Sequence, residues 1–360
     1  MSPSVKVAVI GAGWYAAQYH IPVLATRPDV VLDGVCRLGA PELERVREHF
    51  GFRFASEDYH AVLARKPDVV LVTSPHRMHF EHCQAALAAG ADVLCEKPMT
   101  LDPAQAWALE AQASAAGRHL VLANGYHYLP GLAQVRDAVL AGAVGRIEHV
   151  ACSFVSATRA VFEGDVGLAR WQTHFFQPDR ATWQDPAHGG GFAYGQLSHS
   201  IALALWLTGL EARAVSAHHY CVKGVDLCNA ATVLCGNDAV LALSGAAAMP
   251  EGDEALLRLL ITGTEGAMEV ELDRARAVVH RHDGMNPSFE TTPGQWNYHC
   301  DGPVHAVVDL ALGRGANLTP GAIGAATVSV IAAMAASAKE GGCSVAVFCP
   351  DSSPVGEARQ

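Results

Sequence analysis

The first 125 residues repeat one pattern, in which a short apolar run is followed by a turn and then by a helical stretch of mixed polarity. The runs read VKVAVIGAG, VVLDGVC, DVVLVTSP, ADVLCEKP and HLVLANG, and segments such as APELERVREHFG and FEHCQAALAAG lie between them. Strands that are apolar on both faces and alternate with helices are typical of a parallel sheet covered on both sides. We therefore predict a doubly wound α/β domain over residues 1–125.

The pattern changes after residue 147. Runs of alternating polarity, IEHVACSFVSA, AVSAHHYCV, AATVLCG, AVLALSGAAA, LLRLLITG and AMEVELD, are separated by Gly, Asn and Asp turns. They predict a large, open, mostly antiparallel sheet, so we expect residues 126–345 to form a second, α+β domain. Residues 304–342 predict two helices joined by a Pro-Gly turn, and residues 346–360 are expected to be a loose tail.

Composition limits the partners of the chain. Its 360 residues exceed one ordinary core, and with 50% hydrophobic and 17% charged residues they predict a soluble two-domain protein. The net charge of −11, without a basic run, argues against nucleic acid and anionic membranes as partners. No leader or membrane-length segment is evident, and the ten cysteines form no CxxC pair, so we expect a reducing cytoplasm.

The first junction between strand and helix carries a dinucleotide signal, GAGWYA. Gly11 allows a tight turn, Gly13 lets the backbone approach a pyrophosphate, and Ala16 lets the helix pack closely on the sheet. The first domain is therefore predicted to be a Rossmann domain that binds NAD or NADP, with Trp14 and Tyr15 beside the cofactor. The alternative is a structural turn without a nucleotide.

Arg37 at the end of the second predicted strand favours NADP over NAD, because an arginine at this place suits a 2′-phosphate. An acid that binds the ribose 2′-hydroxyl is missing there. Asp33 lies four residues earlier, about 13 Å away along an extended strand, and cannot substitute. The alternative is that Arg37 stacks on the adenine of either cofactor.

Two ionisable residues stand in unusual places. The fourth strand, ADVLCEKPMT, brings Glu96 and Lys97 to the carboxyl edge of the sheet, where ligands of open α/β folds bind. The segment GGGFAYGQLSHSIALALWLTGL predicts a buried helix that carries one histidine, His199. Taken singly, a solvated lysine and a hydrogen-bonded core histidine are the ordinary interpretations.

Taken together, GAGWYAAQYHIPVL, CEKPMT, and DPAHGGG followed eight residues later by His199 resemble the glucose–fructose oxidoreductase, inositol dehydrogenase and MocA family. TSPHRMHFEH and GANLTPGAIGAATVSVIAAMAASAKEGG extend the resemblance over nearly the whole chain. It implies an NAD(P)-dependent oxidoreductase for a secondary alcohol or ketone of a sugar, aminosugar, cyclitol or glycoside, working as a homodimer or homotetramer. Lys97 would polarise the reacting oxygen and His199 would act as acid and base.

The cofactor residues that follow from the motifs and the resemblance gather at the ends of the predicted strands. They are Gly11, Gly13, Trp14, Tyr15, Arg37, Thr73, Ser74, Pro75, His76, His79, Glu96 and Lys97. His76, His79 and His82 also have the spacing of metal ligands, but structural zinc needs four convergent ligands, so we expect no metal.

One departure from the family concerns the substrate. The family pattern usually has an aspartate four residues before the histidine, where this chain has Gly195, and its absence predicts room for a bulkier substrate. Aromatic and polar side chains in the surrounding segments are the candidate substrate contacts, although a loop packed on its own domain is an equal interpretation for 171–183. The candidates are Tyr126, His127, Trp171, His174, Trp183, Asp185, Tyr194 and Gln196.

Two other functions stay open. A redox-neutral enzyme on the same scaffold could oxidise its substrate transiently and so cleave, eliminate or isomerise it. A non-catalytic cofactor-binding regulator is the other, since a fold does not fix a function.

Overall fold

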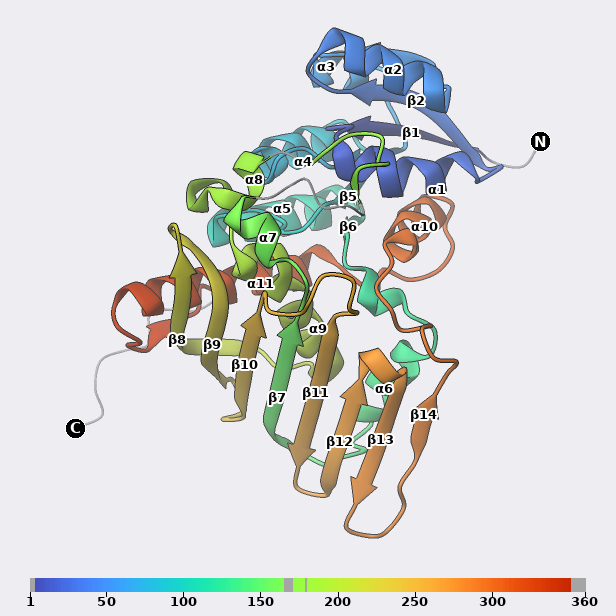
Figure 1. Ribbon diagram of the computed structural model, residues 1–360. Helices are drawn as coiled ribbons and strands as arrows, with labels where there is room; N and C mark the ends of the chain where they lie inside the picture. Colours follow the sequence, from blue (N-terminus) through green and yellow to red (C-terminus); the bar gives the residue numbers. More distant parts are fainter. Residues whose placement is uncertain (1–3, 165–170, 179, 351–360) are drawn as a thin grey trace.

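Two β-sheets organise this computed structural model, which describes residues 4–164, 171–178 and 180–350 (Figure 1). The first sheet has the strand order β3-β2-β1-β4-β5-β6, and the second has the order β14-β13-β12-β11-β7-β10-β9-β8-β15. The first is parallel throughout, whereas in the second only β10 and β7 pair in parallel among the described strands. The predicted fold class is therefore confirmed.

The first sheet is built from short strands joined by helices. Its strands are β1 (Val5–Ile10), β2 (Val30–Cys36), β3 (Phe54–Ser56), β4 (Val69–Val72), β5 (Asp92–Cys95) and β6 (Leu120–Leu122). The helices between them are α1 (Ile21–Ala25), α2 (Ala40–Phe50), α3 (Tyr59–Leu63), α4 (His79–Ala88) and α5 (Pro103–Ala116). The strand order reverses between β1 and β4, and in open α/β sheets ligands bind at the carboxyl ends of the strands beside such a reversal.

Both faces of the first sheet are covered. One face packs against α1 and against α10 (Asp301–Ala311), which contributes Val304 and Val307 to the core. The other face packs against α4 and α5 through residues such as Leu87 and Leu109. Burial on both sides explains why these strands are apolar at nearly every position.

The second sheet belongs to the later part of the chain. Its strands are β7 (Ile147–Val155), β8 (Ala212–Val222), β9 (Val225–Cys235), β10 (Val240–Ala246), β11 (Leu256–Gly263), β12 (Gly266–Glu271), β13 (Arg276–Arg281), β14 (Ser288–Glu290) and β15 (Val345–Ala346). The helices of this part are α6 (Leu132–Leu140), α7 (Arg159–Glu163), α8 (Arg180–Gln184), α9 (Ser198–Thr208) and α11 (Gly321–Lys339). The core between the sheet and α6, α9 and α11 contains Val135, Leu203 and Met334.

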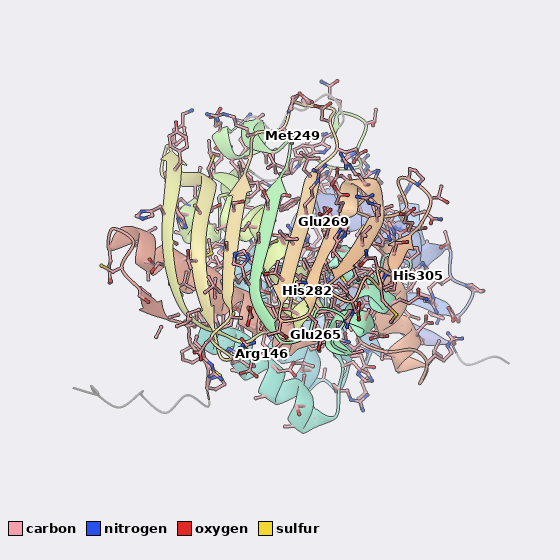
Figure 2. All side chains as sticks on the ribbon, turned by 90° about the horizontal axis from the view of Figure 1, so that it is seen from below. Arg146, Met249, Glu265, Glu269, His282 and His305 are labelled. Carbon is pink, nitrogen blue, oxygen red and sulfur yellow. The ribbon has the colours of Figure 1, made fainter. Side chains whose placement is uncertain are left out.

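The other face of the second sheet is open, and Figure 2 looks onto it with the helices behind. Its side chains are mostly small or polar: Ala230, Thr232 and Ser244 are exposed, and so is Glu269, which the figure labels. The alternation of buried and exposed residues along β9 follows from this one-sided burial.

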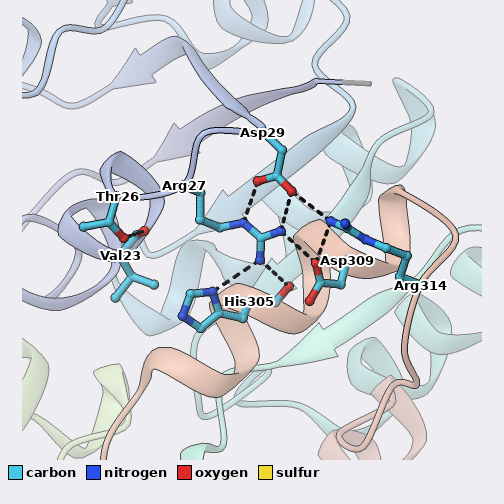
Figure 3. Close-up of polar contacts among 7 residues, drawn as sticks. All are labelled: Val23, Thr26, Arg27, Asp29, His305, Asp309 and Arg314. Atoms are coloured by element: carbon cyan, nitrogen blue, oxygen red, sulfur yellow. Dashed lines mark hydrogen bonds and ion pairs between the residues drawn. The ribbon is translucent and has the colours of Figure 1, made fainter. Parts of the chain in front are cut away.

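The C-terminal part returns to the first sheet and ties the two parts together. Beside β6, the amide of Leu122 donates to the carbonyl of Thr319 at 2.8 Å, and the hydroxyl of Thr319 donates to the carbonyl of Leu122 at 2.8 Å. Near α10, the guanidinium of Arg27 binds Asp309 at 2.7 Å, and Arg314 binds the same carboxylate at 3.0 Å (Figure 3). The two helices predicted for residues 304–342 are α10 and α11.

Helix α11 has the length and apolar composition of a membrane span, but 61% of its most apolar window is buried inside the protein. It contributes Val330, Ile331 and Met334 to the core under the second sheet and Ala325 and Val328 to the core under the first. This burial on both sides identifies it as a core helix that joins the two layers.

Four strands were not predicted from the sequence, namely β3, β13, β14 and β15. Three of them have only two or three residues, too few for a periodic pattern, and β13, which lies between β12 and β14, mixes charged and apolar residues. Residues 351–360 of the predicted tail lie outside the described residues.

Candidate active site

The glycine turn after β1 has the geometry that the motif predicts. Gly11 has φ +92°, and a Cβ there would lie 2.3 Å from the amide nitrogen of Ser74. At Gly13 an added Cβ would meet nothing nearer than the carbonyl of Gly11 at 3.8 Å, so the space before this residue is open. Ala16, which is 1% exposed, packs in the core beside Val9. The turn therefore leaves a cradle that a larger residue would fill.

A cavity of about 730 Å³ extends along the carboxyl edge of the first sheet, from Arg37 beyond β2 to Lys97 beyond β5. Two buried nitrogens on its wall, Nδ1 of His76 and Nε of Arg37, have no hydrogen-bond partner within the described part of the chain. With the open space at Gly13, these features fit a dinucleotide. All the predicted cofactor residues line this cavity: Gly11, Gly13, Trp14, Tyr15, Arg37, Thr73, Ser74, Pro75, His76, His79, Glu96 and Lys97.

The end of β2 supplies no free carboxylate. Asp33 is 3% exposed and is held by Arg65, whose nitrogens donate to its two oxygens at 2.9 and 2.8 Å. The Arg37 guanidinium lies 3.9 Å from the centre of the Phe176 ring and donates to the carbonyl of Ala12 at 3.0 Å. Burial lowers the pKa of Arg37. Arg37 is thus fixed on the cavity wall by a stacked ring and one hydrogen bond.

A second cavity, of about 380 Å³, lies between the two sheets and meets the first at Lys97. The side chains of Trp14, Tyr15, Lys97 and Trp183 line both cavities. His199 lines the second one, so the structure brings the two predicted catalytic residues to a common space.

The amine of Lys97 is held at the junction of the cavities. Its Nζ donates to the carbonyl of Gly195 at 2.6 Å, and the residue is 9% exposed. Burial lowers the pKa of Lys97, against the raising effect of Glu96. The remaining N–H groups of the ammonium are available to an oxygen in the second cavity.

His199 is fixed by a residue that the sequence did not single out. Its Nδ1 lies 3.0 Å from Oδ1 of Asn124, and an amide oxygen only accepts, so Nδ1 carries the proton. Burial, followed by the charge of Lys97 and the neighbouring His127, holds the pKa of His199 well below its usual value. His199 is therefore neutral, with a lone pair on Nε2.

A buried ion pair supports the turn that carries Lys97. Nε2 of His20, which is 0% exposed, lies 2.6 Å from Oε1 of Glu96, and Oε2 of Glu96 accepts the backbone amide of Lys97 at 2.9 Å. Burial lowers the pKa of His20, but Cys300 and Glu96 raise it to a net value of about 10. The ion pair thus fixes the main chain at Lys97 through the hydrogen bond from the Lys97 amide to Glu96.

The expectation of free space at Gly195 is wrong. A Cβ at this position would lie 2.8 Å from Cζ and 2.9 Å from Cε1 of Phe162, and 3.4 Å from Cζ3 of Trp183. The two aromatic rings fill the volume that a carboxylate would need. Gly195 lies in a π-helical turn, Ala193–Leu197, that leads directly into α9 and His199.

The structure brings half of the predicted substrate residues to the second cavity. Those that line it are Tyr126, Trp171, Trp183 and Gln196. The other four do not line it and have partners elsewhere. His127 packs on the Trp206 ring, and His174 accepts a hydrogen bond from Nε1 of Trp14 at 2.7 Å. Asp185 pairs with His188 at 3.0 Å, and the hydroxyl of Tyr194 donates to the carbonyl of Leu101 at 3.3 Å.

Several residues of the site were missed in the sequence. Asn124 and His20 act through their contacts with His199 and Glu96. Three further missed residues line the second cavity: Phe162, Tyr298 and Cys300. Segment 282–300 has no apolar period that would have pointed to it. The tripeptide Ala123–Gly125 contains an Asn-Gly pair, which indicates a turn rather than a site.

The three regularly spaced histidines have partners of other kinds. His79 faces two carbonyl oxygens, and Nδ1 of His82 lies 2.9 Å from the hydroxyl of Ser74. Within residues 4–164, 171–178 and 180–350, no group of three or more His, Cys, Asp or Glu side chains is arranged to hold a metal.

Comparison with known families matches both parts of the chain. Residues 5–126 match the model of an oxidoreductase family with an NAD-binding Rossmann fold, and residues 132–269 match the GFO/IDH/MocA C-terminal domain.

Among proteins of known sequence, D-glucoside 3-dehydrogenase of Escherichia coli K12 is 33% identical over 223 residues, which are 61% of this chain and 58% of that protein. dTDP-3,4-didehydro-2,6-dideoxy-alpha-D-glucose 3-reductase of Streptomyces violaceoruber is 27% identical over 77% of this chain and 83% of its own. A levoglucosan dehydrogenase solved with NADH and levoglucosan has a TM-score of 0.77 at 20% identity, covering 96% of this chain and 99% of that one, and so shares the fold.

Proposed function

This chain belongs to the GFO/IDH/MocA family of NAD-binding oxidoreductases, and on that premise we propose that it transfers hydride between a nicotinamide cofactor and a secondary alcohol or ketone of a carbohydrate-like substrate. One observation carries the proposal. Lys97 lies where the dinucleotide-sized cavity meets a smaller cavity that contains His199.

Lys97 and His199 have different roles at the reacting oxygen. A bound nicotinamide supplies the site that accepts or gives the hydride. The Lys97 ammonium, already anchored on the carbonyl of Gly195, donates a hydrogen bond to the substrate oxygen and offsets its developing negative charge. Nε2 of the neutral His199 takes the hydroxyl proton during oxidation and returns it during reduction.

The aromatic lining of the second cavity supports a sugar, aminosugar, cyclitol or glycoside as substrate. Tyr126, Phe162, Trp171, Trp183 and Tyr298 present ring faces and edges around Lys97 and His199, which suits the mixed polar and apolar surface of a sugar ring. The names of the relatives, a glucoside dehydrogenase and a deoxysugar nucleotide reductase, point to the same substrate class.

The test is a screen of sugars, cyclitols and glycosides that follows the absorbance of the reduced nicotinamide. Lys97→Met and His199→Gln should each lower kcat by about 10²–10⁴-fold while the cofactor still binds. Activity near the parent rate in either variant would refute the assignment of these residues.

For the choice of cofactor, we propose a preference for NADP over NAD. Arg37 lines the cavity, and Asp33 is occupied by Arg65, so a positive charge faces the ribose end. Arg37→Asp should reverse the ratio of the NADPH and NADH dissociation constants. Equal affinities in the parent would favour the alternative, in which Arg37 only stacks on adenine.

A redox-neutral reaction is the second candidate, since one observation favours a firmly held cofactor. Residues 171–178 cross from the second part of the chain onto the first: the Trp171 ring lies 4.8 Å from that of Trp14, and the amide of Phe175 donates to Gln18 at 3.2 Å. Product formation without net change in nicotinamide absorbance would support this candidate over the dehydrogenase.

Two further expectations concern the oligomeric state and the cellular compartment. The open face of the second sheet is a surface on which a second copy could pack, and a homodimer or homotetramer is tested by light scattering. None of the ten cysteines forms a disulfide in the described residues, which supports a reducing cytoplasm, and a fluorescent fusion would test the compartment.

A further inference from the structure

His79 faces two groups that can only accept hydrogen bonds. Its Nδ1 lies 2.8 Å from the carbonyl oxygen of Pro98, and its Nε2 lies 2.8 Å from the carbonyl oxygen of Ser74. A neutral imidazole has one N–H, so one of these contacts would set a nitrogen lone pair against an oxygen lone pair. An imidazolium donates at both positions.

Burial and the adjacent helix end both disfavour a positive charge on His79. His79 is 0% exposed and is the first residue of α4, whose N-terminal end repels cations. Burial lowers the pKa of His79, while Cys95 and the two carbonyls raise it, and the net value is about 9. Cys95 is the largest of the raising causes, and the hydrogen bonds to the two carbonyls are the part that does not depend on the ionisation of Cys95.

The neighbours of His79 leave its charge uncompensated. The titratable groups around it are Cys95 on β5, His82 on α4 and His76 in the loop before α4. Burial keeps the Cys95 thiol protonated by raising its pKa well above the usual value. Burial, and then the charges of His79 and Lys97, hold the pKa of His76 well below its usual value. Among the described residues, His79 forms no ion pair with a carboxylate.

We propose that His79 is a constant imidazolium whose charge makes the cofactor cavity bind the reduced, uncharged nicotinamide in preference to the oxidised, cationic one. The inference rests on the proposed function. His79 lines the cofactor cavity together with Lys97 and Glu96, at the carboxyl ends of β4 and β5. Two positive charges, those of His79 and Lys97, therefore lie at this end of the cavity, where the Glu96 carboxylate is already paired with His20.

The charge of His79 has a consequence for the redox equilibrium of the bound cofactor. A cation beside the cavity repels the oxidised ring and leaves the neutral reduced ring unaffected, so bound cofactor is a stronger oxidant than free cofactor. When cofactor and substrate are both bound, the equilibrium is therefore shifted from the alcohol with oxidised cofactor toward the ketone with reduced cofactor, whereas the equilibrium in free solution is unchanged. His79 acts here as a positioning residue that also carries charge, because it contacts the main chain at Ser74 and at Pro98, the residue after Lys97.

The first measurement needs no cofactor. Imidazole ¹⁵N spectra of the cofactor-free protein near neutral pH should show one ring with both nitrogens protonated that disappears in His79→Gln. His82, whose Nδ1 faces a hydroxyl that can donate, should show one bare nitrogen in the same spectrum, because burial lowers its pKa. A bare nitrogen on His79 would overturn the inference.

The second measurement is the ratio of the dissociation constants of the oxidised and the reduced cofactor, NADP⁺ and NADPH, obtained by titration. In His79→Gln, which keeps a donor but loses the charge, the ratio should fall roughly tenfold. His82→Gln, on the same helix and the same cavity wall, should leave the ratio at the parent value. His79→Lys, which retains a charge, should stay closer to the parent than His79→Gln does.

The possible outcomes distinguish the bias from the proposed function. An unchanged ratio in a His79→Gln protein with the parent circular dichroism would overturn the electrostatic bias, and His79→Asn serves if the glutamine variant does not fold. Failure of the parent to bind either cofactor would refute the proposed function and the bias with it, whereas the ¹⁵N spectrum judges the charge of His79 separately.

Discussion

Gly195→Ala adds a single methyl group at the most crowded point beside the active site. The added Cβ would lie 2.8 and 2.9 Å from two ring carbons of Phe162. Phe162 is itself 1% exposed and is enclosed by the rings of Trp183 and Phe192, with centroids 6.2 Å away in both cases. The ring cannot withdraw without displacing a second aromatic residue.

Two effects of opposite sign set the magnitude. Gly195 lies in a helical turn, where alanine is favoured over glycine by about 1 kcal/mol. Overpacking a filled core costs about 1–3 kcal/mol. We therefore expect Gly195→Ala to lower the free energy of unfolding by about 1 kcal/mol rather than raise it.

A double-mutant cycle separates the two effects. In Phe162→Leu the ring edge is absent, so the crowding disappears and the helical preference remains. Adding Gly195→Ala to Phe162→Leu should then stabilise the protein by up to about 1 kcal/mol. The measurement is urea unfolding of the cofactor-free protein, followed by tryptophan fluorescence and circular dichroism.

A reversal of sign between the two backgrounds is the outcome that the structure requires. If Gly195→Ala stabilises the parent, or has the same effect with and without the Phe162 ring, the close approach of the ring to Gly195 is incorrect. The kinetic counterpart is a lower kcat, because the carbonyl of Gly195 holds the amine of Lys97.

Three further predictions concern hydrogen bonds and protons at the site. Asn124→Ala removes the oxygen that fixes the His199 tautomer, and kcat should fall about 10–100-fold while the cofactor dissociation constant is unchanged; an equal loss in both would contradict this role. Because the pKa of His199 is lowered, kcat/KM for oxidation should stay flat below pH ~6.5, where an ordinary histidine would have lost half its base form, and a pH titration of the rate checks it. The pKa of His20 is raised from 6.5 to about 10, so its contribution to stability is complete below pH 6.5 and is lost as the pH rises through 10; unfolding free energies measured across this range should fall less steeply in His20→Gln than in the parent.

The parts of the site that the sequence predicted are those made by local geometry. The positive φ of Gly11 and the open space before Gly13 follow from one turn, and a parallel strand order brings Arg37 and Lys97 to the same edge. The same local logic predicted most strands of both sheets. His199 was singled out as the one histidine of an apolar helix, and its predicted role came from the resemblance to the family.

The parts that the sequence did not predict depend on distant pairs. His20 and Glu96 are 76 residues apart, and Asn124 and His199 are 75 apart, so no spacing along the chain reveals either pair. The volume at Gly195 depends on the ring of Phe162, which fills the space that the sequence predicted there.

The hydrogen bonds between Leu122 and Thr319 have a consequence for synthesis on the ribosome. The outer edge of β6 receives its partner almost two hundred residues after β6 itself has emerged. Until then, the Rossmann domain exposes the edge of β6 and lacks the core residues that α10 contributes. A nascent or truncated product that stops before this segment is expected to aggregate or be degraded.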